Sequence, residues 1–329
     1  MKKLICLGIE STAHTFSLCL TENEKLIKEK RSMYTKEQGG IIPIEAAKHH
    51  EQIKDRLLAE LLNETKFKLE DIDYIAVSSG PGLPPSLSVG LKFAKDLAIK
   101  YKKPIMGVNH LCAHLEIGKL LTKVKDPVFV FVSGANTQII AHAGNRYRIF
   151  GETLSSGLGN ALDKFGRSID LGFPAGPKIE QLAKQGKYIE LPYTVKGMDI
   201  EPSGIITTAI NKFKQGFKKE DLCYSIQETL FSMLVEVTER ALAHTRKKEA
   251  LLIGGVAANK RLIEMLDIMC KERKNKFYFV PIEFSGDNSY MIAYLGYLEY
   301  LAGIRDDPKK LEFNPNWRID QLETSWIKK

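Results

Sequence analysis

The sequence predicts an α/β protein built from two copies of one lobe. Residues 4–32 have the pattern of an apolar strand, a turn of small residues, a second strand, a polar hairpin and a third strand, and residues 127–151 repeat that order. Each copy is followed by a strand that leads through glycine into a helix, at residues 75–87 and 250–257. Short apolar runs bounded by turn residues are typical of buried strands. Two such lobes could enclose a cleft whose glycine-rich turns hold the phosphates of a nucleotide.

The first copy ends its opening strand at Glu10, and residues 11–14 form the turn that follows. Small residues and hydroxyls in this turn would let backbone amides approach a phosphate. Helical periodicity predicts a helix over residues 45–63. A strand at residues 104–108 then passes into a segment without proline or glycine, which predicts another helix.

That helix carries His110 and His114, which are four residues apart and therefore lie on one face. This geometry suits a divalent metal, although two histidines satisfied by backbone groups would show the same spacing. In the zinc-protease motif a glutamate follows the first histidine, whereas here Leu111 does, which disfavours protease chemistry.

A third metal ligand is available in Asp287, which follows Gly286 where another apolar helix is predicted. As a helix cap alone, Asp287 would need no further explanation. As a ligand, it would complete a His-His-carboxylate set with positions open for a substrate.

Composition narrows the class of protein. The chain has 329 residues and a formal net charge of +8, which fits an anionic partner, nucleic acid first, or a merely solvated basic surface. No run approaches the roughly 20 apolar residues of a membrane span. The five cysteines are scattered and odd in number, which indicates reduced thiols in a cytoplasmic protein.

We predict lobes at residues 1–126 and 127–329. A segment at about residues 171–215, irregular over 191–206, is predicted as an insertion in the second lobe. The last helix is predicted to pack back on the first lobe.

Motifs along nearly the whole chain resemble one known family. They are Gly8–Thr15, Gly80–Leu83 with Pro85–Leu87, Asn109–His110 with Ala113–His114, Val132–Gly134 with Asn136–Gln138, Asp163–Phe165, Lys196–Asp199, Gly254–Ala257 with Asn259, and Gly286–Asn288. The chain thus resembles the tRNA threonylcarbamoyladenosine transferases, formerly called O-sialoglycoprotein endopeptidases. Asn136, where the bacterial branch has histidine, favours the archaeal and eukaryotic branch, the catalytic subunit of the KEOPS complex.

The resemblance implies an actin/hexokinase/Hsp70-like (ASKHA) fold of two ribonuclease-H-like lobes around a nucleotide cleft. It implies that His110, His114 and Asp287 bind one divalent metal, iron with zinc as the alternative. It also implies that ATP, AMP or an adenylate, with Mg²⁺ an option, is held by a set of residues in the second lobe. These are Phe131, Val132, Ser133, Gly134, Ala135, Asn136, Asp163, Gly176, Glu180 and Asn259.

Four departures from the family pattern bear on the site. Phe131 replaces a tyrosine that could reach the metal, and Ala135 replaces a glycine of the phosphate turn. Glu201-Pro202 replaces a Ser-Phe pair, so that a backbone donor is lost. Ile44 replaces an arginine that could contact an anion.

The activity that the resemblance implies is N(6)-L-threonylcarbamoyladenine synthesis, a metal-dependent acyl transfer of class EC 2.3.1. Threonylcarbamoyl would pass from its adenylate to N6 of the adenosine 3′-adjacent to the anticodon of ANN-decoding tRNAs, with release of AMP. Glu10 is a hypothetical catalytic residue that would position a water or take a proton. The implied partners are a small dimerising subunit, a small atypical kinase and a regulatory subunit. Two alternatives stay open: a small-molecule kinase of the ASKHA type and a non-catalytic nucleotide-binding scaffold.

Overall fold

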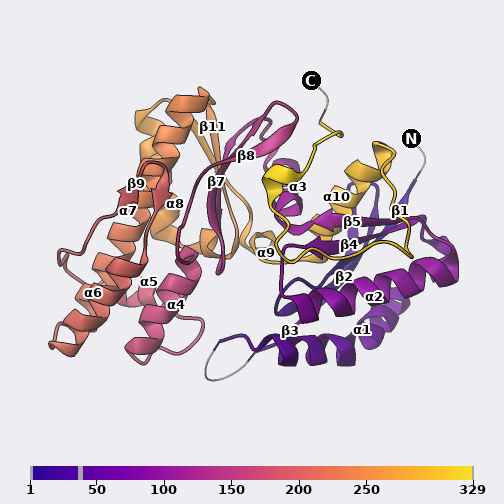
Figure 1. The fold of residues 1–329 in the computed structure, drawn as a ribbon, viewed down its shortest axis with the longest axis horizontal. Coiled ribbons are helices and arrows are strands. Elements are labelled where there is room, and N and C mark those ends of the chain that lie inside the picture. The colour runs from indigo at the N-terminus through magenta and orange to yellow at the C-terminus, as the bar shows by residue number, and fades with distance from the viewer. Residues whose placement is uncertain (1–2, 36–39, 328–329) are drawn as a thin grey trace. The chain divides into compact units, whose positions relative to one another are not determined.

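The computed structural model describes residues 3–35 and 40–327, and its contacts divide them into two compact units (Figure 1). The first unit contains residues 3–35, 41–117 and 287–327, and the second contains residues 40 and 118–286. The chain therefore leaves the first unit earlier than the predicted boundary at residue 126. It returns to that unit at Asp287.

The first unit is built on a five-stranded sheet of order β3-β2-β1-β4-β5. β1 pairs antiparallel with β2, and β2 with β3, whereas β4 lies parallel to both β1 and β5. The strands are β1 (Ile5–Glu10), β2 (Thr15–Glu22), β3 (Lys25–Met33), β4 (Tyr74–Gly80) and β5 (Ile105–Asn109).

Helices cover both faces of this sheet, which explains why its central strands β1 and β4 are buried throughout. α1 and α2 pack together on one face, and α10 packs on β1, β2, β4 and β5 from the other (Figure 1). Gly296 of α10 allows close packing, because a Cβ there would lie 2.4 Å from the Cβ of Ala76. The helices are α1 (Pro43–Thr65), α2 (Pro84–Tyr101), α3 (His110–Thr122), which crosses the division between units, and α10 (Ser289–Leu301), with 3₁₀ turns η1 (Leu69–Asp71) and η3 (Ile319–Gln321).

The second unit repeats this sheet, with the order β12-β11-β6-β7-β8. β6, β7 and β8 are antiparallel neighbours, and β11 lies parallel to both β6 and β12. Read from the third strand of each copy, the two sheets have the same order and directions, so the predicted duplication is confirmed. The strands are β6 (Val128–Val132), β7 (Thr137–Ala143), β8 (Arg146–Glu152), β11 (Glu249–Ile253) and β12 (Lys276–Phe279).

Between β8 and α7 the second unit holds elements that have no counterpart in the first. In the first unit a single helix, α1, follows the meander, whereas here three helices and a hairpin precede the long α7. The residues predicted as irregular, 191–206, contain that hairpin and the start of α6. The elements are α4 (Leu158–Ser168), α5 (Gly176–Ala183), β9 (Val195–Lys196), β10 (Asp199–Ile200), α6 (Ser203–Lys214) and α7 (Lys219–Thr245).

The remaining elements of the second unit follow β11. They are η2 (Gly255–Ala258), α8 (Lys260–Glu272) and α9 (Ile282–Ser285). Across the described residues, no helix combines the length and the apolar character needed to cross a membrane.

Candidate metal centre and ligand-binding turns

Two histidines project from the first turns of α3, which starts directly after β5. The Asn109 side chain fixes this junction, because its Oδ1 accepts from the Cys112 backbone amide at 2.9 Å and its Nδ2 donates to the Trp317 carbonyl at 3.1 Å. The helix therefore begins at His110 and places His114 one turn further on the same face. The ring of His114 is buried and that of His110 is 13% exposed.

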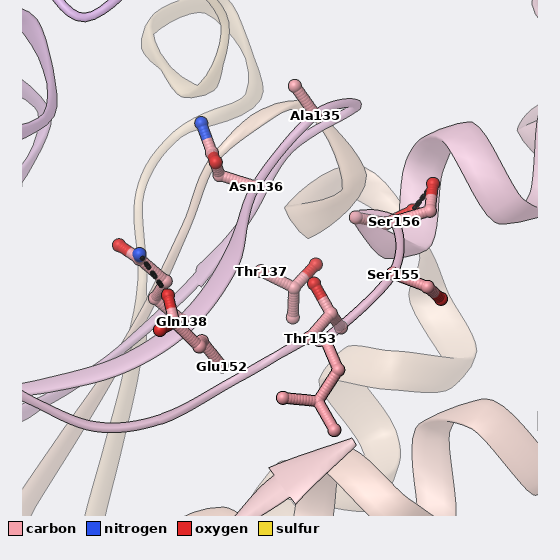
Figure 2. A pocket seen from close by; sticks show the side chains of 10 residues that line it. Ala135, Asn136, Thr137, Gln138, Glu152, Thr153, Ser155 and Ser156 are labelled. Atoms are coloured by element: carbon pink, nitrogen blue, oxygen red, sulfur yellow. Dashed lines mark hydrogen bonds between the residues drawn. The ribbon is translucent and has the colours of Figure 1, made fainter. Parts of the chain in front are cut away.

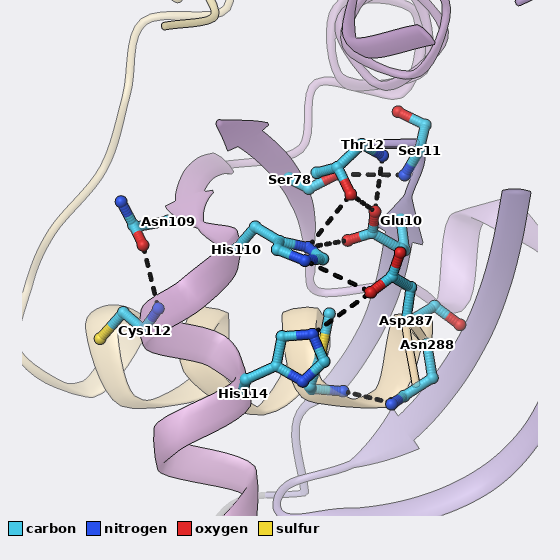
Figure 3. A network of polar contacts seen from close by, with 12 residues as sticks. Glu10, Ser11, Thr12, Ser78, Asn109, His110, Cys112, His114, Asp287 and Asn288 are labelled. Atoms are coloured by element: carbon cyan, nitrogen blue, oxygen red, sulfur yellow. Dashed lines mark hydrogen bonds and ion pairs between the residues drawn. The ribbon is translucent and has the colours of Figure 1, made fainter. Parts of the chain in front are cut away.

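The carboxylate of Asp287 lies beside the rings of both His110 and His114. Its Oδ1 lies 3.3 Å from Nε2 of His114 and 3.4 Å from Nε2 of His110 (Figure 3). The residue that caps α10 is Asn288, whose Oδ1 accepts from the Met291 amide at 3.0 Å. The capping explanation for Asp287 is therefore wrong, and its carboxylate is directed to the histidines instead.

Glu10 adds a second carboxylate behind His110. Its Oε2 lies 3.0 Å from Nδ1 of His110, and its Oε1 accepts from the backbone amide of Thr12 at 2.6 Å and from the Thr12 hydroxyl at 2.5 Å (Figure 3). The Ser11 amide donates to the Ser78 hydroxyl at 3.1 Å. Both amides are thus occupied, which contradicts the expectation that they bind a phosphate. Because Glu10 is fully buried, it contacts the site through His110.

The charges of the cluster depend on one another. Burial disfavours the charged form of His110, but the carboxylates of Glu10 and Asp287 outweigh it and raise the pKa of His110 to about 10. Burial also opposes ionisation of Asp287, yet the two histidines hold the pKa of its carboxyl well below the usual range. Burial lowers the pKa of His114. The buried carboxylate of Glu10 and the partly buried carboxylate of Asp287 therefore need a positive charge beside them, which a divalent cation would also supply.

The donor atoms fit a metal. One atom from each of His110, His114 and Asp287 can be chosen so that all lie within 4.8 Å of one another. Ligands at bond lengths of about 2.0–2.2 Å stand slightly closer than this, so small side-chain movements would bring all three onto one ion. Two imidazoles and one carboxylate suit iron(II) or zinc, with positions left open.

In the second unit, the turn after β6 packs against the start of α4. The carbonyls of Ser133 and Gly134 accept from the amides of Gly159 and Asn160, at 3.2 and 2.9 Å. Gly159 permits this packing, because a Cβ there would lie 2.7 Å from the Cα of Gly134. The amides of Gly134 and Ala135 donate to no described residue, and they remain available to an anion.

The strand before this turn is less accessible. Phe131 and Val132 are buried, and they pair with residues of β7. Their side chains belong to the core, so a ligand could meet these two residues only through their backbone. Asn136, at the other end of the turn, is exposed.

Three further predicted residues lie on two successive helices: Asp163 on α4, and Gly176 and Glu180 on α5. Oδ1 of Asp163 accepts from the amide of Ala175 at 2.7 Å, and the amide of Gly176 also bonds this carboxylate. Burial raises the pKa of Asp163. One turn further on, Glu180 accepts from the amide of Lys260 at 3.0 Å.

Asn259 caps α8. Its Oδ1 accepts from the amides of Arg261 and Leu262 at 2.9 and 3.1 Å, and its Nδ2 donates to Gln227 at 3.1 Å. The next residue along the chain after Asn259 is Lys260, whose amide donates to Glu180. The bonds to Asp163 thus link α4 to the start of α5, where Gly176 lies. The bond between Glu180 and Lys260 links α5 to the start of α8, which Asn259 caps.

Three of the four departures from the family pattern lie where the local structure accommodates them. Pro202 stands at the N-cap of α6, where a helix needs no N–H from it, and Glu201 accepts from the Ser203 amide at 3.0 Å. The methyl group of Ala135 lies on an exposed residue. Ile44 is 63% exposed in the first turn of α1.

Sequence reasoning missed a small polar pocket of about 110 Å³ beside the turn after β6 (Figure 2). Gln138 and Glu152 line it, and they face each other across β7 and β8. The hairpin register brings them together, and register was not part of the sequence prediction.

The duplicated sheets place the chain in the ASKHA fold class. A solved structure with the same fold is component A of (R)-2-hydroxyglutaryl-CoA dehydratase from Acidaminococcus fermentans. It is 12% identical, with a TM-score of 0.58 over 91% of this chain and 99% of that chain. At this identity the likeness shows the fold alone.

Sequence comparison identifies the family. The model for TsaD, tRNA N6-adenosine threonylcarbamoyltransferase, matches residues 25–294, and the chain belongs to this family. A tRNA N6-adenosine threonylcarbamoyltransferase from Thermococcus sibiricus is 52% identical over 98% of this chain and 100% of its own length. A probable bifunctional tRNA threonylcarbamoyladenosine biosynthesis protein from Methanocaldococcus jannaschii is 49% identical over 99% of this chain, which spans 61% of that protein.

Proposed function

We propose that this chain transfers threonylcarbamoyl from threonylcarbamoyl-adenylate to N6 of the adenosine 3′-adjacent to the anticodon of ANN-decoding tRNAs, releasing AMP. Family membership carries the proposal, because relatives about half identical over their full length are named for transfer to tRNA adenosine. In this reaction the amine forms a bond to the carbamoyl carbon, the bond from that carbon to the phosphate oxygen breaks, and the amine proton is lost.

His110, His114 and Asp287 would hold one divalent metal, Fe²⁺ with Zn²⁺ as the alternative. When bound, such an ion supplies Lewis acidity to a carbonyl oxygen. The three residues support this role because their donor atoms converge and because Asp287 is directed to the rings rather than to a helix end.

Glu10 is best assigned to positioning rather than to proton transfer. A carboxylate that accepts the Nδ1–H of a histidine keeps that proton on Nδ1 and fixes the plane of the ring, so that Nε2 is the nitrogen that would lose its proton to bind a metal. Since both oxygens of Glu10 accept hydrogen bonds and the residue is fully buried, it holds His110 in place.

The adenylate would bind to the second unit. Its phosphate would accept from the amides of Gly134 and Ala135, with Ser133 and Asn136 at the ends of the turn, and its nucleoside would lie near Asp163, Gly176, Glu180 and Asn259. Gly176 supports this, because no atom lies within 4 Å of where its Cβ would stand, so that a ligand could approach the backbone. The same surface would serve ATP, with Mg²⁺ as a counter-ion.

The net charge of +8 supports tRNA as the second substrate. A KEOPS-like set of partners, comprising a small dimerising subunit, a small atypical kinase and a regulatory subunit, would assist the chain. All five cysteines are buried and none forms a disulfide with another described residue, which supports a reaction in the reducing cytoplasm.

The test is transfer of labelled threonylcarbamoyl from its adenylate to cognate tRNA, run anaerobically with the partner subunits. We expect the wild-type chain to transfer the label and Asp287→Asn to lose transfer. The matched control is Asp267→Asn, which changes a carboxylate paired with Lys271 on α8. Absence of wild-type transfer, with partners shown to be competent using another family member, would favour the nucleotide-binding scaffold. Phosphorylation of a small molecule that survives loss of both histidines would favour the kinase.

A further inference from the structure

The pocket beside the turn after β6 is polar and lies within the second unit. Its volume of about 110 Å³ exceeds the roughly 30 Å³ that one water occupies in the liquid. It opens between the start of β7, the end of β8 and the loop that leads to α4 (Figure 2). The lining residues are Ala135, Asn136, Thr137, Gln138, Glu152, Thr153, Leu154, Ser155, Ser156 and Gly157.

One residue that lines the pocket, Gln138, has a buried side-chain atom without a hydrogen-bond partner among the described residues. The residue is only 9% exposed, and its Nε2 donates to Oε2 of Glu152 at 3.0 Å. Its Oε1 is buried and has no hydrogen-bond partner among the described residues. A buried acceptor left in this state is costly, and a ligand that brings a donor would relieve this cost once the carboxamide turns far enough to expose Oε1.

The orientation of this carboxamide is fixed by its neighbour. A carboxylate accepts and does not donate, so the atom that faces Glu152 must be Nε2 and the atom that faces away must be Oε1. The side chain keeps one acceptor oxygen and one further N–H for a ligand.

The residues around Gln138 are held in place by hydrogen bonds to other parts of the second unit. The Thr137 hydroxyl accepts from the amide of Leu158 at 3.0 Å, and the Thr137 carbonyl accepts from the amide of Thr153 at 3.1 Å. The Ser155 hydroxyl donates to Glu201. The Thr137 and Ser155 hydroxyls are therefore engaged, and the side-chain amides of Gln138 and Asn136 are the lining groups that carry an acceptor and a donor side by side.

We propose that this pocket binds the edge of an adenine base. The exocyclic amine would donate to Oε1 of Gln138, and the remaining N–H of Gln138 would donate to a ring nitrogen, which is the bidentate pairing of glutamine with adenine. Leu154, which lines the pocket and is 50% exposed, would cover one face of the base. Enzymes that modify a base commonly read it in such a pocket after it has left the stack.

The inference rests on the proposed function, in which adenine occurs twice, in the acceptor nucleoside and in the donor adenylate. Since the nucleoside of the adenylate is assigned to the surface around Asp163 and Asn259, and only its phosphate to the turn that contains Ala135 and Asn136, the acceptor base is the expected occupant here. The chemistry of the pocket is the same for both sources, and the experiment separates them.

The experiment measures binding of an anticodon stem-loop RNA and of AMP to the full chain with its partners. The variants are Gln138→Met, which keeps the length of the side chain and removes its hydrogen bonds, and Gln181→Met, a matched control on the exposed face of α5. A second RNA carries purine riboside at the acceptor position, and so lacks only the exocyclic amine. Thermal melts establish that each variant is folded.

We expect Gln138→Met to weaken binding of the adenosine RNA by about 5- to 150-fold, the range for a good bidentate pair. The variant should weaken binding of the purine-riboside RNA less, because that RNA already lacks the bond to Oε1 and can lose only the bond from the remaining N–H to its ring nitrogen. A loss confined to AMP would keep the adenine site and assign it to the donor. Unchanged binding of both ligands, or an equal loss for both RNAs, would overturn the proposal. Wild-type transfer is measured on the same preparation, so a failed proposed function and an empty pocket give different results.

Discussion

Nδ1 of His110 lies 3.0 Å from Oε2 of Glu10, while Nε2 of the same ring lies 3.4 Å from Oδ1 of Asp287. One carboxylate thus holds the ring from behind and the other faces it in front. This arrangement directs Nε2 toward Asp287, and the proposed positioning role of Glu10 can be measured without any reaction.

Glu10→Gln should weaken binding of Fe²⁺ or Zn²⁺ by about 10- to 100-fold, the usual effect of removing a carboxylate that supports a metal-binding histidine. Isothermal titration of the metal-stripped chain measures this. Glu51→Gln, which changes an exposed carboxylate paired with Lys54 on α1, is the control and should bind metal as wild type does. Equal affinities for Glu10→Gln and wild type would remove Glu10 from the metal centre.

Asn259→Ala should lower the free energy of unfolding by about 1 kcal/mol, because the variant loses the cap of α8. Asn259→Asp keeps an oxygen that can accept from Arg261 and Leu262, and it should lose less. Denaturant unfolding measures both, and nucleotide titration follows on the folded variants. If the Asp variant binds AMP as wild type does, Asn259 serves the helix and not the ligand.

Gly159→Ala should be strongly destabilising, because its Cβ would lie 2.7 Å from the Cα and 2.9 Å from the carbonyl oxygen of its neighbours in the turn after β6. Gly255→Ala is the matched control, since no atom lies within 4 Å of the added Cβ. The melting temperature should fall clearly for the first variant and little for the second. Similar melting temperatures would show that the turn is not packed on α4 as described.

Glu299 of α10 should make stability depend on pH. Burial, and then the charge of Asp306, raise the pKa of its carboxyl to about 8. The folded state therefore holds a proton that the unfolded state has lost between about pH 4.5 and 8, so stability falls as pH rises through that window. Glu299→Gln should be more stable than wild type at pH 9, by about 1–3 kcal/mol, and similar at pH 5.

The control for this variant is Glu312→Gln, which changes an exposed carboxylate in the same unit and should leave the pH profile unchanged. Parallel stability profiles for wild type and Glu299→Gln between pH 5 and 9 would contradict the assignment.

The sequence predicted the fold because the periodicity of apolar residues is local information. Two meanders followed by strand-helix units could be recognised without knowing which strands pair. The start of α3 was equally local, since Asn109 ends the strand and also caps the helix. The residue that caps α10 could not be predicted from local sequence in this way. Asp287 and Asn288 are both good helix caps, and only the structure shows that Asn288 takes the role.

The features that the sequence could not predict are contacts between residues that lie far apart along the chain. The amides of Ser11 and Thr12 looked available to a phosphate until Ser78 and Glu10 were seen to accept from them. Gln138 and Glu152 are brought together only by the register of β7 and β8, which carries an irregularity beside Ile139. A shift by one residue would have placed the two side chains on opposite faces.

We propose that transfer depends on a metal ion held by His110, His114 and Asp287. The most direct measurement strips the chain of metal under anaerobic conditions, returns Fe²⁺ in steps, and follows both bound metal and threonylcarbamoyl transfer to tRNA. We predict that the two rise together and level off at about one ion per chain, with Zn²⁺ as the comparison. Transfer that persists at full strength in the metal-free chain would contradict the claim.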